Sequence, residues 1–174
     1  MSGIVLTKAS ARLSADIGAP EDIAYPGTIG LAVDAIDVTR HVFRVKETIP
    51  VQGSALTLLY PKWLPGHHSP TGRIDTLARP EIHAHGKRVE WLRDTVDVYA
   101  FHVDVPSGAK KLDLEFQFLS AGDGNEGRIV MTPEMLNLQW NSVVLYPAGH
   151  FVRQITFEPT IRLPDGWQLS ATAP

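Results

Sequence analysis

The sequence predicts an all-β protein with the fold of an antiparallel β-sandwich, and three observations support this prediction. Short stretches alternate apolar and polar side chains, which is the pattern of a strand with one buried face. These stretches follow one another at intervals of roughly 8–12 residues, and clusters of proline and glycine separate them. No stretch longer than the single turn opened by Thr132-Pro133-Glu134 has the apolar spacing of a helix.

The strongest strand pattern covers residues 112–118, where four apolar side chains alternate with Asp113, Glu115 and Gln117. The same period predicts strands at 43–49, 56–60, 97–106 and 129–131, a hairpin at 81–91 that turns at His85-Gly86-Lys87, and two short pieces at 155–157 and 161–163 on either side of Pro159. Residues 135–146 form a longer apolar run with interleaved amides, and residues 121–127 are predicted to form a flexible loop.

These elements fall within residues 29–174, which we expect to form one β-sandwich domain. Residues 1–28 contain the breakers Gly18-Ala19-Pro20 and Tyr25-Pro26-Gly27, so we expect a mobile leader with one edge strand at most. The sequence stops soon after a strand-like stretch, at residues 171–174, and we therefore expect it to be a fragment of a longer protein.

Composition argues against several classes of protein. The net charge is −3 and the 16 lysine and arginine residues are spread along the chain, so we expect no nucleic-acid partner. No apolar run reaches the roughly 18 residues that a membrane span needs. The chain has no cysteine, which excludes disulfides, thiolate metal ligands and cysteine nucleophiles.

A broken segment between the second and third predicted elements carries unusual side chains. Its prolines and glycines (Pro61, Pro65, Gly66, Pro70, Gly72) prevent a helix or an inner strand. Within it lie Trp63, Leu64, His67 and His68. A rigid loop of this kind is either a binding loop or a plug that docks against another domain. We favour the plug, with Trp63 and Leu64 as an interdomain anchor rather than a platform for carbohydrate.

Four motifs follow one another along the chain: Tyr60-Pro-Lys-Trp-Leu-Pro-Gly, the strand that ends at Val105-Pro106, the run from Met131 to Gly149, and Leu163-Pro-Asp-Gly-Trp. In this order they resemble the glycyl aminopeptidase family of zinc metallopeptidases. The resemblance spans residues 29–170 and implies the saddle-like, β-rich N-terminal domain of a thermolysin-like aminopeptidase. The family's zinc motif, H-E-x-x-H, does not occur in this sequence. We therefore expect no enzyme activity from this chain alone, and zinc in the catalytic domain of a parent aminopeptidase.

Three amides are candidates for binding a peptide substrate. Asn137, Gln139 and Asn141 alternate, so on one strand they would share a face and could hydrogen-bond to a peptide backbone. The resemblance implies that Gln139 lies near the position from which the relatives' first domain binds the free N-terminus of the substrate. The alternative is an ordinary solvated strand face. His67 and His68 are further candidates at a cleft rim, although Gly66-His67-His68-Ser69 departs from the Gly-Ser-Tyr that is usual in the family.

A metal site is not expected in this chain. His83 and His85 are two residues apart and would share one face of a strand, which supplies two ligands of the kind that zinc prefers. A third ligand is not evident from the sequence, so two solvent-facing histidines beside a turn are the simpler interpretation.

The sequence therefore predicts a non-catalytic N-terminal domain that packs on the catalytic domain of the same parent chain and shapes the peptide-substrate cleft. One alternative is a free-standing β-sandwich module that binds peptide or carbohydrate through Trp63, Trp91 and the histidine loop. A small metal-dependent hydrolase that uses the histidines is a third hypothesis. The first hypothesis also predicts an apolar patch, with a possible homodimer of the fragment. The resemblance implies a periplasmic or secreted protein, although no signal-peptide pattern is seen.

Overall fold

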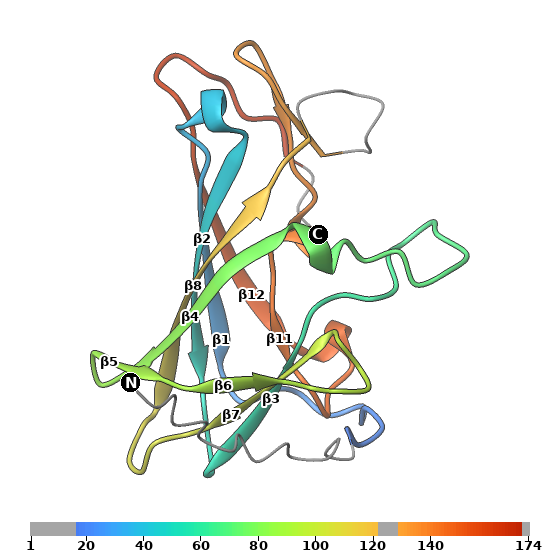
Figure 1. Cartoon of the computed structure of the whole chain (residues 1–174), viewed down its shortest axis with the longest axis vertical. Coiled ribbons are helices and arrows are strands. Elements are labelled where there is room, and N and C mark those ends of the chain that lie inside the picture. The colour runs from blue at the N-terminus through green and yellow to red at the C-terminus, as the bar shows by residue number, and fades with distance from the viewer. Residues whose placement is uncertain (1–16, 122–128, 172–174) are drawn as a thin grey trace, which may run out of the picture.

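The computed structural model describes residues 17–121 and 129–171 (Figure 1). The part of the predicted leader at residues 1–16 and most of the predicted loop at 121–127 lie outside these ranges. Within them there is no α-helix, and the chain forms strands joined by loops and short 3-10 turns. None of its helical turns is long and apolar enough to cross a membrane. The prediction of an all-β fold is confirmed.

Two main sheets build the molecule. The larger has the order β12-β1-β2-β8-β4-β5, and its strands are β12 (Thr156–Arg162), β1 (Thr28–Asp34), β2 (Val42–Pro50), β8 (Lys111–Leu119), β4 (Leu77–Ala84) and β5 (Lys87–Val89). The smaller has the order β11-β3-β7-β6, with β11 (Tyr146–Pro147), β3 (Ala55–Leu59), β7 (Ala100–Asp104) and β6 (Trp91–Arg93). A separate two-stranded ribbon joins β9 (Val130–Met131) to β10 (Leu136–Asn137).

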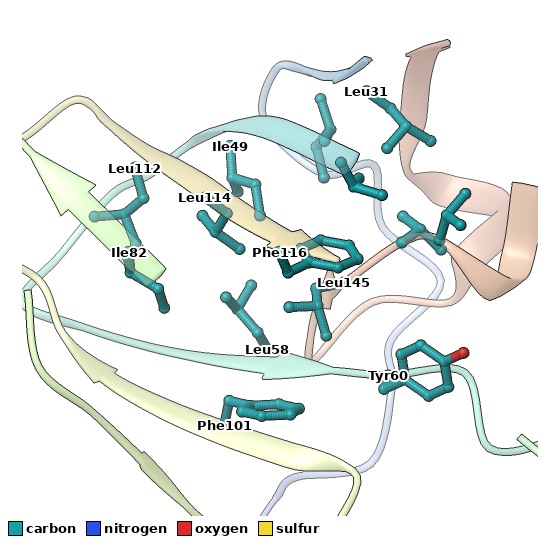
Figure 2. Close-up of a cluster of buried hydrophobic side chains, with 14 of the residues drawn as sticks. Leu31, Ile49, Leu58, Tyr60, Ile82, Phe101, Leu112, Leu114, Phe116 and Leu145 are labelled. Atoms are coloured by element: carbon teal, nitrogen blue, oxygen red, sulfur yellow. The ribbon is translucent and has the colours of Figure 1, made fainter. Parts of the chain in front are cut away.

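The core lies between the two main sheets, as the period-2 pattern requires. Side chains at alternate positions of β8 are buried, and Leu114 and Phe116 face Leu58 and Phe101 of the smaller sheet (Figure 2). Residues between them, such as Glu115, point to solvent. Each large apolar side chain that is fully buried contributes about 1.5–3 kcal/mol to folding, so this alternation specifies which face of each strand turns inward.

The β4–β5 hairpin confirms the predicted turn at His85-Gly86-Lys87. His85 and Gly86 have φ angles of 52° and 72°, and Ala84 pairs with Lys87, so two left-handed residues connect the strands. This is the geometry of a type I′ turn, whose twist matches that of the flanking strands.

The prediction of two pieces separated by Pro159 is wrong. Strand β12 runs without a break from Thr156 to Arg162, and Pro159 pairs with Leu31 within it. β12 is an edge strand, so the missing N–H of proline can face away from the sheet without loss of a ladder hydrogen bond. β12 also runs parallel to β1, so the larger sheet is not purely antiparallel.

The strand predicted at 97–106 is shorter than expected and begins at Ala100. The carboxylate of Asp94 accepts hydrogen bonds from the backbone N–H groups of Val96 (2.8 Å) and Asp97 (2.9 Å). These bonds hold residues 94–97 in a turn, because a side-chain acceptor competes with strand pairing for the same donors.

Candidate functional site

The loop from Pro61 to Thr76 has a closed neck. The N–H of Gly72 donates to the carbonyl of Lys62 at 3.0 Å, and Trp63 forms a β-bridge with Pro70. A Cβ atom on Gly72 would lie 1.9 Å from the carbonyl oxygen of Pro61, so the two backbones approach closely enough to require glycine. The predicted rigid loop is thus held by its own backbone, with η2 (Ile74–Thr76) leading into β4.

A turn from the smaller sheet clamps this neck from the side. The Lys62 ammonium lies 3.5 Å from the Asp97 carboxylate and 5.4 Å from the centre of the Tyr99 ring. The Tyr99 hydroxyl donates to the carbonyl of Gly72 at 3.0 Å. Residues 94–99 therefore position the loop that carries Trp63 and His67.

A chain of three polar side chains holds that turn in place. Thr57 Oγ1 lies 3.0 Å from His102 Nδ1, and His102 Nε2 lies 2.8 Å from Asp94 Oδ2. The hydrogen bond from His102, together with the N–H groups of Asp97 and Val96, lowers the pKa of Asp94 to about 2. A hydroxyl, an imidazole and a carboxylate in a row resemble a nucleophilic triad. Here the carboxylate also caps the 94–97 turn, so we assign the chain of residues a structural role.

Beside the loop lies a mostly apolar groove of about 690 Å³. Trp63 stands at its edge with 64% of its surface exposed. The groove runs between the loop, the segment at 140–146 and the inner face of β12, and its lining is Leu31, Pro61, Lys62, Trp63, Pro65, Trp140, Asn141, Val144, Tyr146, Val152, Ile155, Phe157 and Pro159. We call this hollow the aromatic groove.

A second hollow, of about 560 Å³, has more polar side chains in its lining than the aromatic groove, and residues 64–76 of the loop contribute to its wall. We call it the polar hollow. His67 and Gln139 both line it, together with Thr71, Arg73 and Ser142. His67 Nδ1 lies 2.8 Å from Thr71 Oγ1, which orients the imidazole along the wall. The structure therefore brings together two of the predicted substrate-binding residues, one from each segment.

A 3-10 turn, η4 (Trp140–Ser142), separates these hollows and a third one. Gln139 lines both the polar hollow and the third hollow. Trp140 lines the third hollow and the aromatic groove, and Asn141 lines the aromatic groove. Asn137 lines only the third hollow, which has a volume of about 500 Å³. Residues 140–142 thus form a ridge between the hollows, with Asn141 lining the aromatic groove and Ser142 lining the polar hollow.

The prediction that Asn137, Gln139 and Asn141 share the face of one strand is wrong. β10 ends at Asn137, and the N–H of Ser142 donates to the carbonyl of Gln139 at 2.9 Å, which turns the chain. A turn of about three residues rotates successive side chains away from the two-residue alternation of a strand. The peptide-binding role of each amide stays a prediction.

The other predicted residues are placed as follows. Leu64 is half-buried and lines the polar hollow, so Trp63 is the more exposed member of the predicted anchor pair. His68 is exposed on the loop and does not line any of the three hollows described here. Trp91 is half-buried, its indole N–H donates to the carbonyl of Pro80 at 3.0 Å, and its ring packs on Phe101.

The described residues do not fit the zinc that the family implies. No group of three histidine, aspartate or glutamate side chains comes together within residues 17–121 and 129–171. His85 lies in the left-handed turn after β4, so it does not share the strand face of His83. The predicted sharing of one face by this pair is therefore wrong, and we derive no chemistry through a metal on this chain.

Glu47 is one of three polar or charged residues that are buried in the described part of the chain, with Asp94 and Ser142, and the sequence predicted a role for none of them. Glu47 is 1% exposed in the middle of β2, and both its carboxylate oxygens lie within hydrogen-bond distance of the backbone N–H of Leu145, at 3.0 and 3.2 Å. The alternation of β2 could have predicted that Glu47 is buried, because Glu47 occupies the inward position between Val45 and Ile49.

The fold occurs in other solved structures. An aminopeptidase N family protein from Idiomarina loihiensis has the same fold, with a TM-score of 0.67 and 16% identity over 79% of this chain and 22% of that protein. An M1 zinc metallopeptidase from Deinococcus radiodurans, solved with a Tyr-Ser-Ala substrate, aligns at 13% identity over 82% of this chain and 32% of its own, with a TM-score of 0.42. This chain thus spans well under half the length of either protein.

No curated protein matches the sequence. The sequence model of the Peptidase M61 N-terminal domain matches residues 30–174, which is most of the chain. That match agrees with the four motifs found in the sequence and with the β-rich architecture. The chain therefore belongs to the Peptidase M61 N-terminal domain family.

Proposed function

We propose that this chain is the non-catalytic N-terminal domain of a zinc-dependent aminopeptidase and that it docks on the catalytic domain of the same parent chain through the aromatic groove. The observation that carries the proposal is Trp63, which a clamped loop holds with 64% of its surface in solvent beside an apolar hollow. An exposed aromatic on a rigid support is a typical interface anchor, because little side-chain entropy is lost when it is covered.

The position of the polar hollow supports a role in shaping the substrate cleft. Gln139 and His67 line it, and it adjoins the groove across the ridge at residues 140–142. If the groove is covered by the catalytic domain, this hollow lies at the rim of that contact. A glutamine amide there can both accept from and donate to a peptide terminus. Zinc in this proposal belongs to the catalytic domain, and export of the parent protein remains a prediction from the resemblance.

The first test is the length and sequence of the natural reading frame. A frame of several hundred residues with H-E-x-x-H after this domain supports the proposal. A stop codon shortly after the codon for Pro174 would overturn it. This measurement is independent of any property of the isolated chain.

The second test uses Trp63→Ala in the full-length parent protein. We expect hydrolysis of glycyl and alanyl substrates to fall at least tenfold, because a lost hot-spot aromatic costs about 2 kcal/mol or more of interface free energy. Met135→Ala is the matched control, since Met135 is 55% exposed but lies outside the groove. Equal activities for the two variants would contradict docking through Trp63.

A free-standing binding module is the second candidate function, and one observation favours it. Trp63, Trp140 and Tyr146 line the same groove, which suits an extended apolar peptide or a sugar ring. Trp91, by contrast, is packed against Phe101 and is not part of that surface. The chain can be titrated with glycyl peptides and with oligosaccharides while NMR monitors the indole N–H signals. This measurement distinguishes the binding module from the docking domain. Saturable shifts of Trp63 and Trp140 would support the module.

A further inference from the structure

The buried acid Glu47 lies next to a residue that lines the aromatic groove. Leu31 lines the groove from β1, and its cross-strand partner on β2 is Glu47. On the other side Glu47 pairs with Leu114 of β8. The carboxyl group therefore lies between two leucines, one of which forms part of the groove wall.

The hydrogen-bond partner of Glu47 is Leu145, which belongs to the segment at residues 143–146 that forms another wall of the groove. The N–H of Leu145 donates to the two carboxylate oxygens at 3.0 and 3.2 Å. The neighbours of Leu145 in the chain, Val144 and Tyr146, both line the groove. One side chain of the larger sheet thus holds the backbone of the segment that leads from the ridge at residues 140–142 into β11.

This position is poorly suited to a charge. A carboxylate needs several donors when it leaves water, and here both oxygens share one N–H. Burial raises the pKa of Glu47 well above its ordinary value, and the Leu145 N–H offsets only part of that effect. The uncharged acid is therefore the form that fits the closed structure.

No charged side chain on the neighbouring strands faces Glu47. The charged residues of β1, β2 and β8 alternate to the outer face, namely Asp34, Arg44, Lys46, Lys111, Asp113 and Glu115. In the opposite layer, two phenols belong to the core or pack against it: that of Tyr60, which donates to the carbonyl of Ser142, and that of Tyr146. Burial raises the pKa of both phenols above 10, so neither supplies a compensating charge.

We propose that Glu47 is a pH-sensitive anchor of the groove: as the neutral acid it holds Leu145 and the groove wall against the sheet, and its ionisation releases that wall. The proton goes to solvent, and the carboxylate gains water as the segment at 143–146 moves away from the sheet. This inference does not depend on what occupies the groove. It would make the groove less rigid in alkaline conditions than in acidic ones.

Hydrogen exchange at the Leu145 amide tests the anchor directly. Opening that ionises Glu47 releases one proton, so its equilibrium constant should rise about tenfold per pH unit from roughly pH 4.3 up to the pKa of the closed form. The protection factor of Leu145 should fall by the same factor. In Glu47→Gln, whose amide oxygen can still accept from Leu145 but cannot ionise, the protection factor should not change with pH.

Glu115→Gln is the matched control, because Glu115 lies on the adjacent strand β8 but points outward to Lys46. This variant should keep the pH dependence of the wild type. A pH-dependent Leu145 protection factor in Glu47→Gln would overturn the proposal. Should Glu47→Gln fail to fold, a carbon-13 titration of the Glu47 carboxyl in the wild-type chain decides: titration well above pH 4.3 supports the anchor, and titration near roughly 4.3 refutes it.

Discussion

Individual residues in this domain make close backbone contacts that their neighbours in sequence do not predict. Gly72 is the best example, because the carbonyl oxygen of Pro61 occupies the space that any side chain would need. The hydrogen bond from Gly72 to Lys62 closes the loop, and Tyr99 bonds to the same glycine. A single residue without a side chain therefore connects the loop, its neck and the clamping turn.

We predict that Gly72→Ala destabilises the domain by about 1–3 kcal/mol, the usual range for forcing an extra carbon into a packed site. The two strands of the neck must separate to accommodate the methyl group. Urea unfolding followed by fluorescence measures the free energy of unfolding. Gly18→Ala is the control, since a Cβ there meets no atom within 4 Å, and it should change stability by less than about 0.5 kcal/mol. Equal effects of the two substitutions would contradict the close-contact interpretation.

Asp94 makes the stability of the domain sensitive to acid. Its folded pKa is about 2, chiefly because His102 donates to it, whereas an unfolded aspartate has a pKa of roughly 3.9. The stability from this group is therefore fully present above about pH 4 and is lost as the pH falls through about 2.

We expect the free energy of unfolding of the wild type to fall between about pH 5 and pH 2 by more than that of Asp94→Asn, because asparagine cannot be protonated in this range. Chemical unfolding at each pH gives both curves. Parallel curves for the two proteins would show that the pair with His102 does not contribute.

Among the secondary-structure elements, the β4–β5 hairpin has a turn whose backbone conformation does not suit one of its residues. The β4–β5 hairpin places His85 at a φ of 52°, a left-handed conformation that a histidine adopts at some cost. Glycine follows it, so the turn has the backbone of a type I′ hairpin but the preferred residue at only one of its two positions.

His85→Asn should therefore raise the free energy of unfolding by roughly 0.5–1 kcal/mol, because asparagine tolerates the left-handed region better. Thermal unfolding provides the measurement. His68→Asn makes the same chemical change in an exposed loop residue without a positive φ and should have no measurable effect. A gain in His68→Asn as large as that in His85→Asn would mean that the cause is not the turn.

On the surface of the whole domain, the aromatic groove is the feature that we expect a binding partner to cover. Trp63 and Val152 are both more than half exposed at its edge, and its lining is mostly apolar. Surfaces of this kind mark interaction sites and promote self-association when the partner is absent.

We predict that the isolated chain dimerises at high concentration and that Trp63→Lys shifts it toward monomer, because a lysine ammonium must stay hydrated. Sedimentation equilibrium measures the dissociation constant, which should rise at least tenfold in the variant. Met135→Lys changes an exposed apolar residue outside the groove and should leave the dissociation constant unchanged. A strictly monomeric wild-type chain would argue against an adhesive groove.

The sequence alone determined the all-β class, most strand positions and the hairpin turn, because period-2 burial and turn residues act over a few neighbours. The four motifs also identified the family. Only the tertiary structure decided that Pro159 sits within an edge strand, that a 3-10 turn after Gln139 separates Asn141 from Asn137 and Gln139, and that His67 and Gln139 line one hollow. Each of these depends on which distant backbone lies opposite, and so does the contact between Glu47 and Leu145, 98 residues apart. Such long-range pairing leaves no local pattern in the chain.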